Sequence, residues 1–234
     1  MPKPIEGLTG NGCHAHISVW DAPGSASKTN VFATTAANKG EGQTGEVGLS
    51  ERGKHFLGGI MKHASALAAI TNPTVNSYKR INAPRTMSGA TWAPNSVTWT
   101  GNNRTHMVRI PDDQRLELRL PDGAAHPYLL QAAVLASGLD GIERQLDPGP
   151  RHDNDNYAEP LPAGSCPSLP RDLGEALEAF AADGHLANHR QAIHVRVHGN
   201  TKIGLGRLYF IRKISKMFRE WFWIMRKVSC GFTV

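Results

Sequence analysis

Cysteine is scarce in this chain of 234 residues, which contains only Cys13, Cys166 and Cys230. The three are far apart and form no C-x-x-C pair, so the sequence favours free thiols in a reducing compartment over a disulfide framework or a zinc site. No run of about 18 apolar residues could cross a bilayer, and the first residues lack the apolar core of a secretory signal. We therefore expect a cytoplasmic protein that does not bind a membrane.

Acidic residues are nearly absent from the C-terminal part of the chain. Residues 185–234 contain ten Lys or Arg and one Glu, whereas residues 1–184 contain 16 basic and 19 acidic residues. The slightly acidic body argues against a nucleic-acid partner. Apolar residues in 210–225 recur at helical spacing opposite basic ones, which predicts a basic amphipathic helix. One alternative is therefore a non-catalytic fragment whose tail binds a membrane surface or an acidic partner.

Nucleotide-binding loops of the common kinds are also missing. There is no G-x-x-x-x-G-K-[ST] segment and no G-x-G-x-x-G turn after a strand, so neither a P-loop nor a Rossmann site is indicated.

Period-two alternation predicts a strand over 14–20 with His14, His16 and Ser18 on one face. Further patterns predict helices over 50–70, 127–146 and 173–182, strands over 105–110 and 115–120 joined by a turn at 111–113, and loops over 81–104 and 147–170.

The predicted strand over 115–120 reads R-L-E-L-R-L, which puts Arg115, Glu117 and Arg119 on one face and three leucines on the other. A carboxylate between two guanidiniums stays ionised, and an ionised Glu is a good ligand for a hard cation. The flanking guanidiniums suit phosphate or carboxylate. The simpler alternative is a solvated strand face with ion pairs. Likewise, His14 and His16 could serve a metal and a phosphate or be ordinary exposed histidines.

Five segments within residues 10–133 carry a family resemblance: G-N-G-C-H-A-H-I-S, N-P-T-V-N-S-Y-K-R, N-N-R-T-H-M-V-R-I-P, R-L-E-L-R-L-P-D and A-A-H-P-Y-L-L-Q-A-A. In this order they resemble the C-terminal catalytic region of glutamine synthetases. The resemblance implies an ATP-dependent ligase that phosphorylates the side chain of glutamate and lets ammonia or a small alkylamine attack the γ-glutamyl phosphate. It implies an α+β fold, an antiparallel sheet with flanking helices. It also implies Mg²⁺ or Mn²⁺ as cofactor and a ring-shaped homo-oligomer with active sites between subunits.

The same resemblance implies roles for individual residues. The metal would be bound by His14 and Glu117, and the substrate glutamate by Gly10, Arg80 and Arg119. ATP would be bound by His16, Ser18, Arg109 and Arg115. Arg104 would stabilise the phosphoryl group in transfer, and Trp92 would stand at the amine.

Trp92-Ala93-Pro94 departs from the Glu-Ala-Pro that the family's flexible loop usually carries. An indole cannot take a proton from ammonium, but its face can contact an alkylammonium. The surrounding S-G-A-T-W-A-P-N resembles the branch that contains γ-glutamylmethylamide synthetases and type III glutamine synthetases. Simple loop packing of Trp92 is the alternative.

The two ends of the chain depart from the family as well. The segment before His14 resembles an internal one, so we expect the domain to be truncated at the N-terminus, without the β-grasp domain and most metal-binding glutamates. Residues 201–234 resemble nothing in the family. We therefore expect a partial catalytic domain over 1–184, an atypical basic tail over 185–234, and an isolated chain that is incomplete and inactive.

Overall fold

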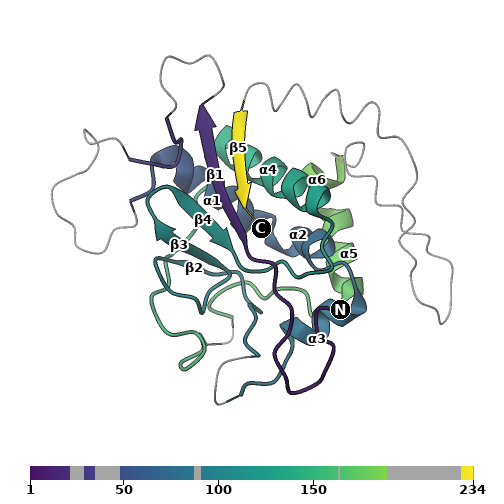
Figure 1. Ribbon diagram of the computed structural model, residues 1–234. Coiled ribbons are helices and arrows are strands. Elements are labelled where there is room, and N and C mark those ends of the chain that lie inside the picture. The colour runs from purple at the N-terminus through teal and green to yellow at the C-terminus, as the bar shows by residue number, and fades with distance from the viewer. Residues whose placement is uncertain (22–28, 35–47, 87–90, 163, 189–227, 234) are drawn as a thin grey trace.

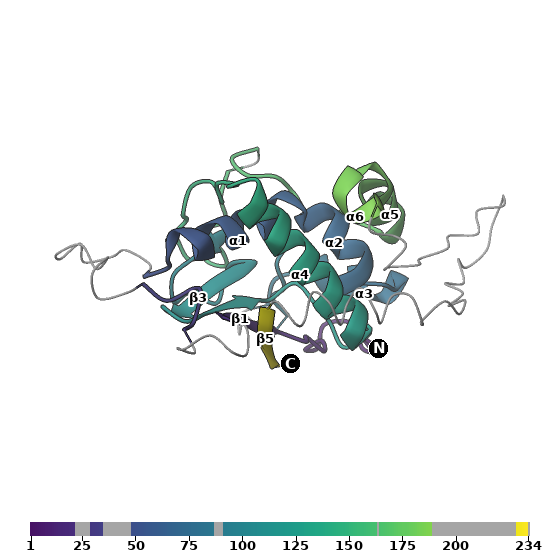
Figure 2. The same cartoon turned by 90° about the horizontal axis from the view of Figure 1, so that it is seen from above.

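The computed structural model describes residues 1–21, 29–34, 48–86, 91–162, 164–188 and 228–233. Within them, a five-stranded sheet is covered on one face by helices α1 (Glu51–Lys62), α2 (Ala64–Thr71) and α4 (Pro127–Glu143). Figure 2 shows this helical layer above the sheet, with α5 (Leu173–Ala182) and α6 (Gly184–Asn188) packed beyond it. The opposite face of the sheet carries no helix among the described residues (Figure 2).

The sheet has the strand order β2-β3-β4-β1-β5. Strands β1 (Ala15–Asp21), β4 (Arg115–Leu118) and β3 (Val108–Asp112) pair in antiparallel fashion, and β5 (Val228–Thr233) pairs antiparallel with the other edge of β1. The short β2 (Trp99–Thr100) runs parallel to β3. The α+β expectation is confirmed, but the sheet is mixed rather than purely antiparallel, because the 101–107 loop returns the chain to the start of β2 before β3 begins.

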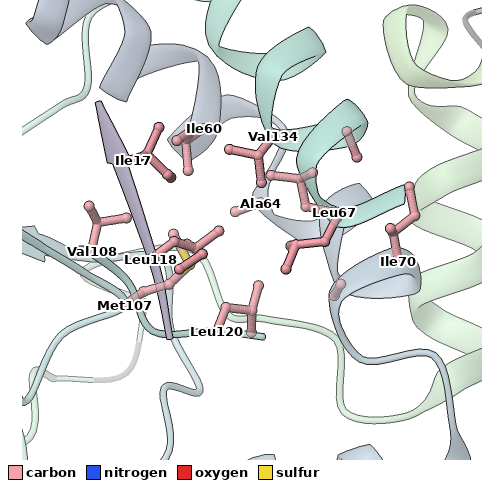
Figure 3. Packing of buried hydrophobic residues seen from close by; sticks show 14 of the residues in the cluster. Ile17, Ile60, Ala64, Leu67, Ile70, Met107, Val108, Leu118, Leu120 and Val134 are labelled. Atoms are coloured by element: carbon pink, nitrogen blue, oxygen red, sulfur yellow. The ribbon is translucent and has the colours of Figure 1, made fainter. Parts of the chain in front are cut away.

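The core lies between the sheet and the helical layer. Along β1, Ala15, Ile17 and Val19 are buried against the helices, as the period-two pattern predicts. Leu118 of β4 joins them, and Figure 3 shows Ile17 and Leu118 close to side chains of α1, α2 and α4. Since successive residues alternate between faces, His16 and Ser18 of β1 and Glu117 of β4 lie on the sheet face away from the core.

The helix predicted over 50–70 is present but interrupted. It begins as expected, with Ser50 as the N-cap whose Oγ accepts a hydrogen bond from the Gly53 N–H at 3.0 Å, and it ends at Asn72. At His63 it breaks into α1 and α2. The apolar spacing gives no sign of this break, which falls at the residue whose ring makes the buried contacts described below.

Close helix packing holds α1 and α4 together over the sheet. A Cβ added to Gly59 would collide with the backbone carbonyl of Ser137, and one added to Gly141 would collide with the carbonyl of His55. Glycine at these positions therefore lets the two backbones approach at the crossing. The helix α4 starts at Pro127 as predicted and ends at Glu143, three residues before the predicted end.

Several other predictions need smaller changes. The predicted strands over 105–110 and 115–120 are β3 and β4. Strand β3 lies two to three residues later than predicted, whereas β4 begins at Arg115 as predicted but ends at Leu118. Asp112 therefore pairs with Arg115, and the turn lies at 113–114. Helix α3 (Val75–Ile81) was not predicted; it is held by a capping box between Thr74 and Ser77. Helix α5 has the predicted bounds.

The tail lies almost wholly outside the described residues. The predicted amphipathic helix over 210–225 falls there, and only β5 is described beyond residue 188. Among the described residues, no helix is long and apolar enough to cross a membrane.

Candidate active site

The face of the sheet away from the helices gathers most of the predicted site residues. Across the strands, His16 of β1 is paired with Glu117 of β4, and Glu117 is paired with Arg109 of β3. Antiparallel pairing brings the side chains of such partners within contact distance on one face. This register puts an imidazole, a carboxylate and a guanidinium side by side.

Glu117 is the centre of the arrangement and is 3% exposed. Its Oε2 accepts a hydrogen bond from Arg109 Nη1 at 2.7 Å, and its Oε1 accepts one from Arg119 Nη1 at 2.6 Å. Burial by itself would raise the pKa of this carboxyl, but the hydrogen bonds from His14 and Arg109 and the charges of Arg119 and Arg109 lower it well below its usual range. Glu117 is therefore an ionised carboxylate at every physiological pH.

His14 lies next to this carboxylate, with Nδ1 at 3.3 Å from Glu117 Oε1 and 3.4 Å from Arg119 Nη1. Its side chain is 36% exposed, so one side of the ring remains accessible. The two predicted metal ligands are thus adjacent. An imidazole nitrogen and an anionic oxygen are suitable donors for Mg²⁺ or Mn²⁺. Among the described residues, however, no group of three or more His, Cys, Asp or Glu side chains could hold a metal, so these two would be only part of a complete set of ligands.

Arg80 and Arg119, both predicted to bind glutamate, are 5% and 9% exposed. Arg80 Nη1 donates to the Leu120 carbonyl at 3.0 Å, and Nη2 donates to the Arg119 carbonyl at 3.4 Å. These bonds tie the end of α3 to the end of β4. Gly10 lies against Arg80, because a Cβ there would approach its Cγ at 3.4 Å. The three predicted glutamate-binding residues are therefore neighbours, directly or through the backbone.

Two buried nitrogen atoms on this face have no hydrogen-bond partner among the described residues. They are Nε of Arg119 and Nδ1 of His16. Burial lowers the pKa of His16, and the charges of Arg115 and Arg109 lower it further against the opposing effect of Glu117, so the ring is neutral at pH 7. An unpaired buried polar group is costly by about 1–3 kcal/mol. Both atoms are thus candidate contacts for a polar ligand.

Trp92 reaches the site through Arg119. The guanidinium carbon of Arg119 lies 5.7 Å from the centre of the indole ring, which is within the range of a cation–π contact. Trp92 also lines a pocket of about 240 Å³ together with Thr91, Asn95 and Tyr157. The ring therefore separates the Arg119–Glu117 group from this pocket.

The remaining predicted residues are placed less centrally. Ser18 is on the site face, but its Oγ accepts a hydrogen bond from Trp20 Nε1 at 3.1 Å. Arg115 has a side chain that is 48% exposed and forms an ion pair with Asp112 at 2.9 Å. Arg104 is exposed in the 101–107 loop. Burial lowers the pKa of Arg119, and the charges of Arg109 and Arg104 lower it to a smaller extent. The charge of Glu117 and its hydrogen bond to Arg119 raise this pKa. Arg104 is thus close enough to act on the site electrostatically.

Three residues that support the site were not singled out from the sequence. Asn102 Oδ1 accepts hydrogen bonds from both Nε and Nη2 of Arg109, which orients that guanidinium toward Glu117. Gly12 lies between Arg80 and His14, since a Cβ there would be 3.0 Å from Arg80 Nη2 and 3.1 Å from His14 Nε2. Gly12 belongs to one of the motifs that carry the family resemblance. Only the folded structure shows why a side chain does not fit there, because Arg80 and His14 occupy the space that a Cβ would need.

The third supporting residue is Asp122, which is fully buried. Its carboxylate accepts hydrogen bonds from Asn72 Nδ2 and the Ala124 N–H, both at 2.9 Å. Asn72 Nδ2 also donates to the Leu120 carbonyl at 3.0 Å, the same carbonyl that Arg80 uses. The buried Asp122 carboxylate thus lies close to the buried Arg80 guanidinium. Burial lowers the pKa of Arg80, and the charge of Asp122 raises it part of the way back.

Comparison with known proteins identifies the family of this chain. The family profile described as glutamine synthetase, catalytic domain, matches residues 1–197. The chain is 62% identical over 186 residues to a glutamine synthetase of Rhizobium meliloti, covering 80% of this chain and 40% of that protein. It is 45% identical over 186 residues to a glutamate–methylamine ligase of Methyloversatilis universalis, covering 78% of this chain and 39% of that protein. A solved structure described as a GmaS/ADP complex superposes with a TM-score of 0.69 at 56% identity, covering 80% of this chain and 40% of that one.

The chain belongs to the glutamine synthetase family, a family of ligases, and has the fold of its catalytic domain. It spans about 40% of the length of the relatives that it matches.

Proposed function

We propose that these residues form part of the active site of an ATP-dependent ligase that joins the side-chain carboxylate of glutamate to ammonia or a small alkylamine. The observation that carries the proposal is the buried, ionised Glu117 between Arg109 and Arg119 with His14 beside it. A purely structural ion pair would need only one guanidinium. A group with surplus positive charge and unpaired nitrogen atoms on Arg119 and His16 is suited to anionic ligands.

The reaction that fits has two steps. An oxygen of the glutamate γ-carboxylate attacks the terminal phosphorus of ATP, and ADP leaves. The amine nitrogen then attacks the acyl carbon of γ-glutamyl phosphate, phosphate leaves with the bonding electron pair, and the nitrogen loses a proton to give the amide. In the first step two anions must come into contact, so the main demand on the protein is fixed positive charge.

The arginines of the site meet that demand in different places. Arg80 and Arg119 would hold the glutamate carboxylates, because both are buried and anchored on the end of β4. Arg109, Arg104 and Arg115 would neutralise the phosphates, with His16 and Ser18 beside them. Arg104 and Arg115 are exposed, so we expect them to act on the part of ATP that is nearer to solvent.

A divalent metal would be held by His14 and Glu117, with further ligands from outside the described residues. Such an ion supplies Lewis-acid stabilisation of phosphate oxygens. Arg109 and Arg119 would keep Glu117 ionised and oriented while it binds the ion. A homo-oligomeric ring and a cytoplasmic location belong to the same proposal and rest on the family resemblance.

The amine is the part of the proposal that depends on Trp92. Its indole ring has no charge that attracts ammonium, but it offers apolar surface, and burial of one methyl group is favourable by roughly 0.8 kcal/mol. Arg119 already lies over the ring at 5.7 Å, so the amine would have to use the other face or the edge of the ring. A cation–π contact there would add about 0.5–2 kcal/mol. Because ammonium could make the same cation–π contact, only the methyl group distinguishes the two amines, and its burial favours methylamine by roughly fourfold at equal concentration.

A chimera tests both parts of the proposal. Residues 1–182 of this chain would replace the matching segment of the Rhizobium meliloti glutamine synthetase, with which the chain is 62% identical. We expect ADP release that requires glutamate and an amine, with kcat/KM about fourfold higher for methylamine than for ammonium. Trp92→Glu should reverse the preference, whereas the matched control Trp92→Phe should largely retain it.

The two possible failures are distinct. A soluble, assembled chimera that releases no ADP with either amine would contradict the ligase itself. A chimera that uses ammonium as well as methylamine, and whose ratio does not change in Trp92→Glu, would contradict only the role of Trp92, which would then be packing in the loop.

A further inference from the structure

A second cluster of charged residues lies away from the candidate active site, within the helical layers. His63, at the junction of α1 and α2, is 3% exposed. Its Nε2 is 2.9 Å from Asp140 Oδ2 on α4, and its Nδ1 is 2.6 Å from Asp183 Oδ2 at the C-terminal end of α5. One buried imidazole thus connects three helical elements that are far apart in the sequence.

This geometry fixes the protonation state of the ring. A carboxylate accepts hydrogen bonds and cannot donate one, so each ring nitrogen must carry a proton to bond its carboxylate. A neutral imidazole has only one N–H, and its bare nitrogen would face a negative oxygen. Burial by itself lowers the pKa of His63, but the hydrogen bonds to Asp183 and Asp140 and the charges of these two carboxylates raise it overall. His63 is therefore an imidazolium in the folded protein.

Other charged groups around the ring come from each neighbouring helix. On α4, Arg144 Nη1 is 3.1 Å from Asp140 Oδ2. On α6, His185 Nδ1 is 3.2 Å from Asp140 Oδ1, and its Nε2 is 3.2 Å from the Ala136 carbonyl. Lys62, the residue before His63, is exposed. Loss of the His63 proton removes one of the positive charges that face the two carboxylates and leaves a bare ring nitrogen opposite a negative oxygen.

We propose that His63, Asp140 and Asp183 form a proton-dependent clamp that holds α5 and α6 against α2 and α4 and opens when His63 loses its proton. Helix α5 is held along its length by apolar contacts, since Ala176 and Phe180 are buried and Leu173 and Leu177 pack against the same core. At its C-terminal end, where the chain passes into α6, the charged contact of Asp183 with His63 adds to them, so the clamp acts at that end. The clamp is independent of the proposed ligase activity.

The sign of the pH effect follows from the direction of the shift. The folded-state pKa of His63 is raised, so the clamp is fully closed below the ordinary histidine pKa of about 6.5. Above that pH the closing equilibrium falls by up to tenfold per pH unit, until the folded-state pKa has been passed. On the acid side, the pKa values of Asp140 and Asp183 are lowered by His63 despite burial, so their contribution is lost only as the pH falls below the usual carboxylate range.

Two measurements on the 234-residue chain test the clamp. Imidazole ¹⁵N NMR at pH 7 should show His63 with protons on both nitrogens, and titration should move it to the neutral form only above the ordinary histidine pKa of about 6.5. Hydrogen exchange followed by mass spectrometry, corrected for intrinsic rates, should show protection of residues 173–188 decreasing up to tenfold per pH unit above about pH 6.5. Protection of β1 and β4 should change little over the same range.

Variants separate the clamp from general effects of pH. His63→Gln keeps a side chain that can hydrogen-bond but has no charge, so exchange in 173–188 should be faster already at pH 6 and insensitive to pH. Asp183→Asn should lower the pKa of His63. His152→Gln, a histidine of the 147–170 loop that stacks on His106, should leave the pH dependence unchanged.

The outcomes that overturn the proposal are specific. A His63 ring with a single proton at pH 7 would contradict the assignment, and this result is available even if His63→Gln fails to fold. Equal pH dependence of exchange in 173–188 for the unmodified chain and His63→Gln would also overturn it.

Discussion

Replacing Glu117 by Gln should destabilise the chain strongly, although the substitution changes only one atom of the carboxyl group. Both carboxylate oxygens accept hydrogen bonds from guanidiniums, at 2.7 and 2.6 Å. In Glu117→Gln, the amide NH₂ would take the position of one of these oxygens and point its hydrogen atoms at a guanidinium. Arg109 and Arg119, whose side chains are 14% and 10% exposed, would also lose their shared counter-charge.

The magnitude follows from burial. Removing one partner of a buried ion pair costs about 3–5 kcal/mol, because the remaining charge has neither water nor a partner. For a chain of this size, that corresponds to a decrease in Tm of roughly 6–20 °C. The lowered pKa of Glu117 also gives a pH dependence. Its stabilisation is fully present above the unfolded-state pKa of about 4.3 and is lost as the pH falls through the folded-state value, so the two proteins should converge in acid.

Urea unfolding of the 234-residue chain, followed by circular dichroism between pH 3 and pH 8, measures this difference. Glu51→Gln is the matched control, because it removes the same charge from a side chain that is 76% exposed and pairs with Lys54 only at the surface; it should change the free energy of unfolding by less than about 0.5 kcal/mol. If Glu117→Gln were as stable as the unmodified chain at pH 7, Glu117 would not be the counter-charge of the two arginines.

Two further predictions concern the ligands of the site. In the chimera, Gly12→Ala should raise KM for glutamate about tenfold with less effect on KM for ATP, because a Cβ would displace Arg80 Nη2 from a position 3.0 Å away; steady-state kinetics would show this, and an unchanged KM for glutamate would contradict it. The 234-residue chain should bind Mn²⁺ no more tightly than roughly millimolar, because His14 and Glu117 are a partial ligand set. Titration followed by electron paramagnetic resonance measures this binding, and micromolar affinity that survives His14→Ala would show that the metal binds elsewhere.

Local patterns predicted much of the fold because local physics decides those elements. The alternation in 14–20 follows directly from one buried and one open sheet face, and Ser50 caps α1 through a contact only three residues long. The break at His63 could not be predicted in this way. Apolar spacing continues across it, and the His63 ring at the break contacts two carboxylates that lie 77 and 120 residues further along the chain. The parallel pairing of β2 with β3 could not be predicted from local patterns either, because it depends on the course of the 101–107 loop.

For the candidate site, alternation correctly put Glu117 and Arg119 on the face opposite the leucines of β4. Alternation alone did not distinguish Arg119 from Arg115, which has the same parity. Their environments differ because Arg119 is covered by the 10–14 segment and Trp92, whereas Arg115 stands at the open start of β4 beside Asp112. Asn102 orients Arg109 because the loop that carries it folds back on β3. A periodic pattern in the sequence cannot predict such a contact.

Arg119 connects the parts of the proposed reaction. Its guanidinium bonds to Glu117, approaches His14 at 3.4 Å and lies over the ring of Trp92, and its backbone carbonyl accepts a hydrogen bond from Arg80. The proposed metal ligands, the arginines proposed to bind glutamate and the loop proposed to contact the amine therefore meet at one side chain. A change at Trp92 alters the surroundings of the same guanidinium that orients Glu117. Amine preference and metal dependence should consequently change together in Trp92→Glu, because the new carboxylate would compete with Glu117 for Arg119.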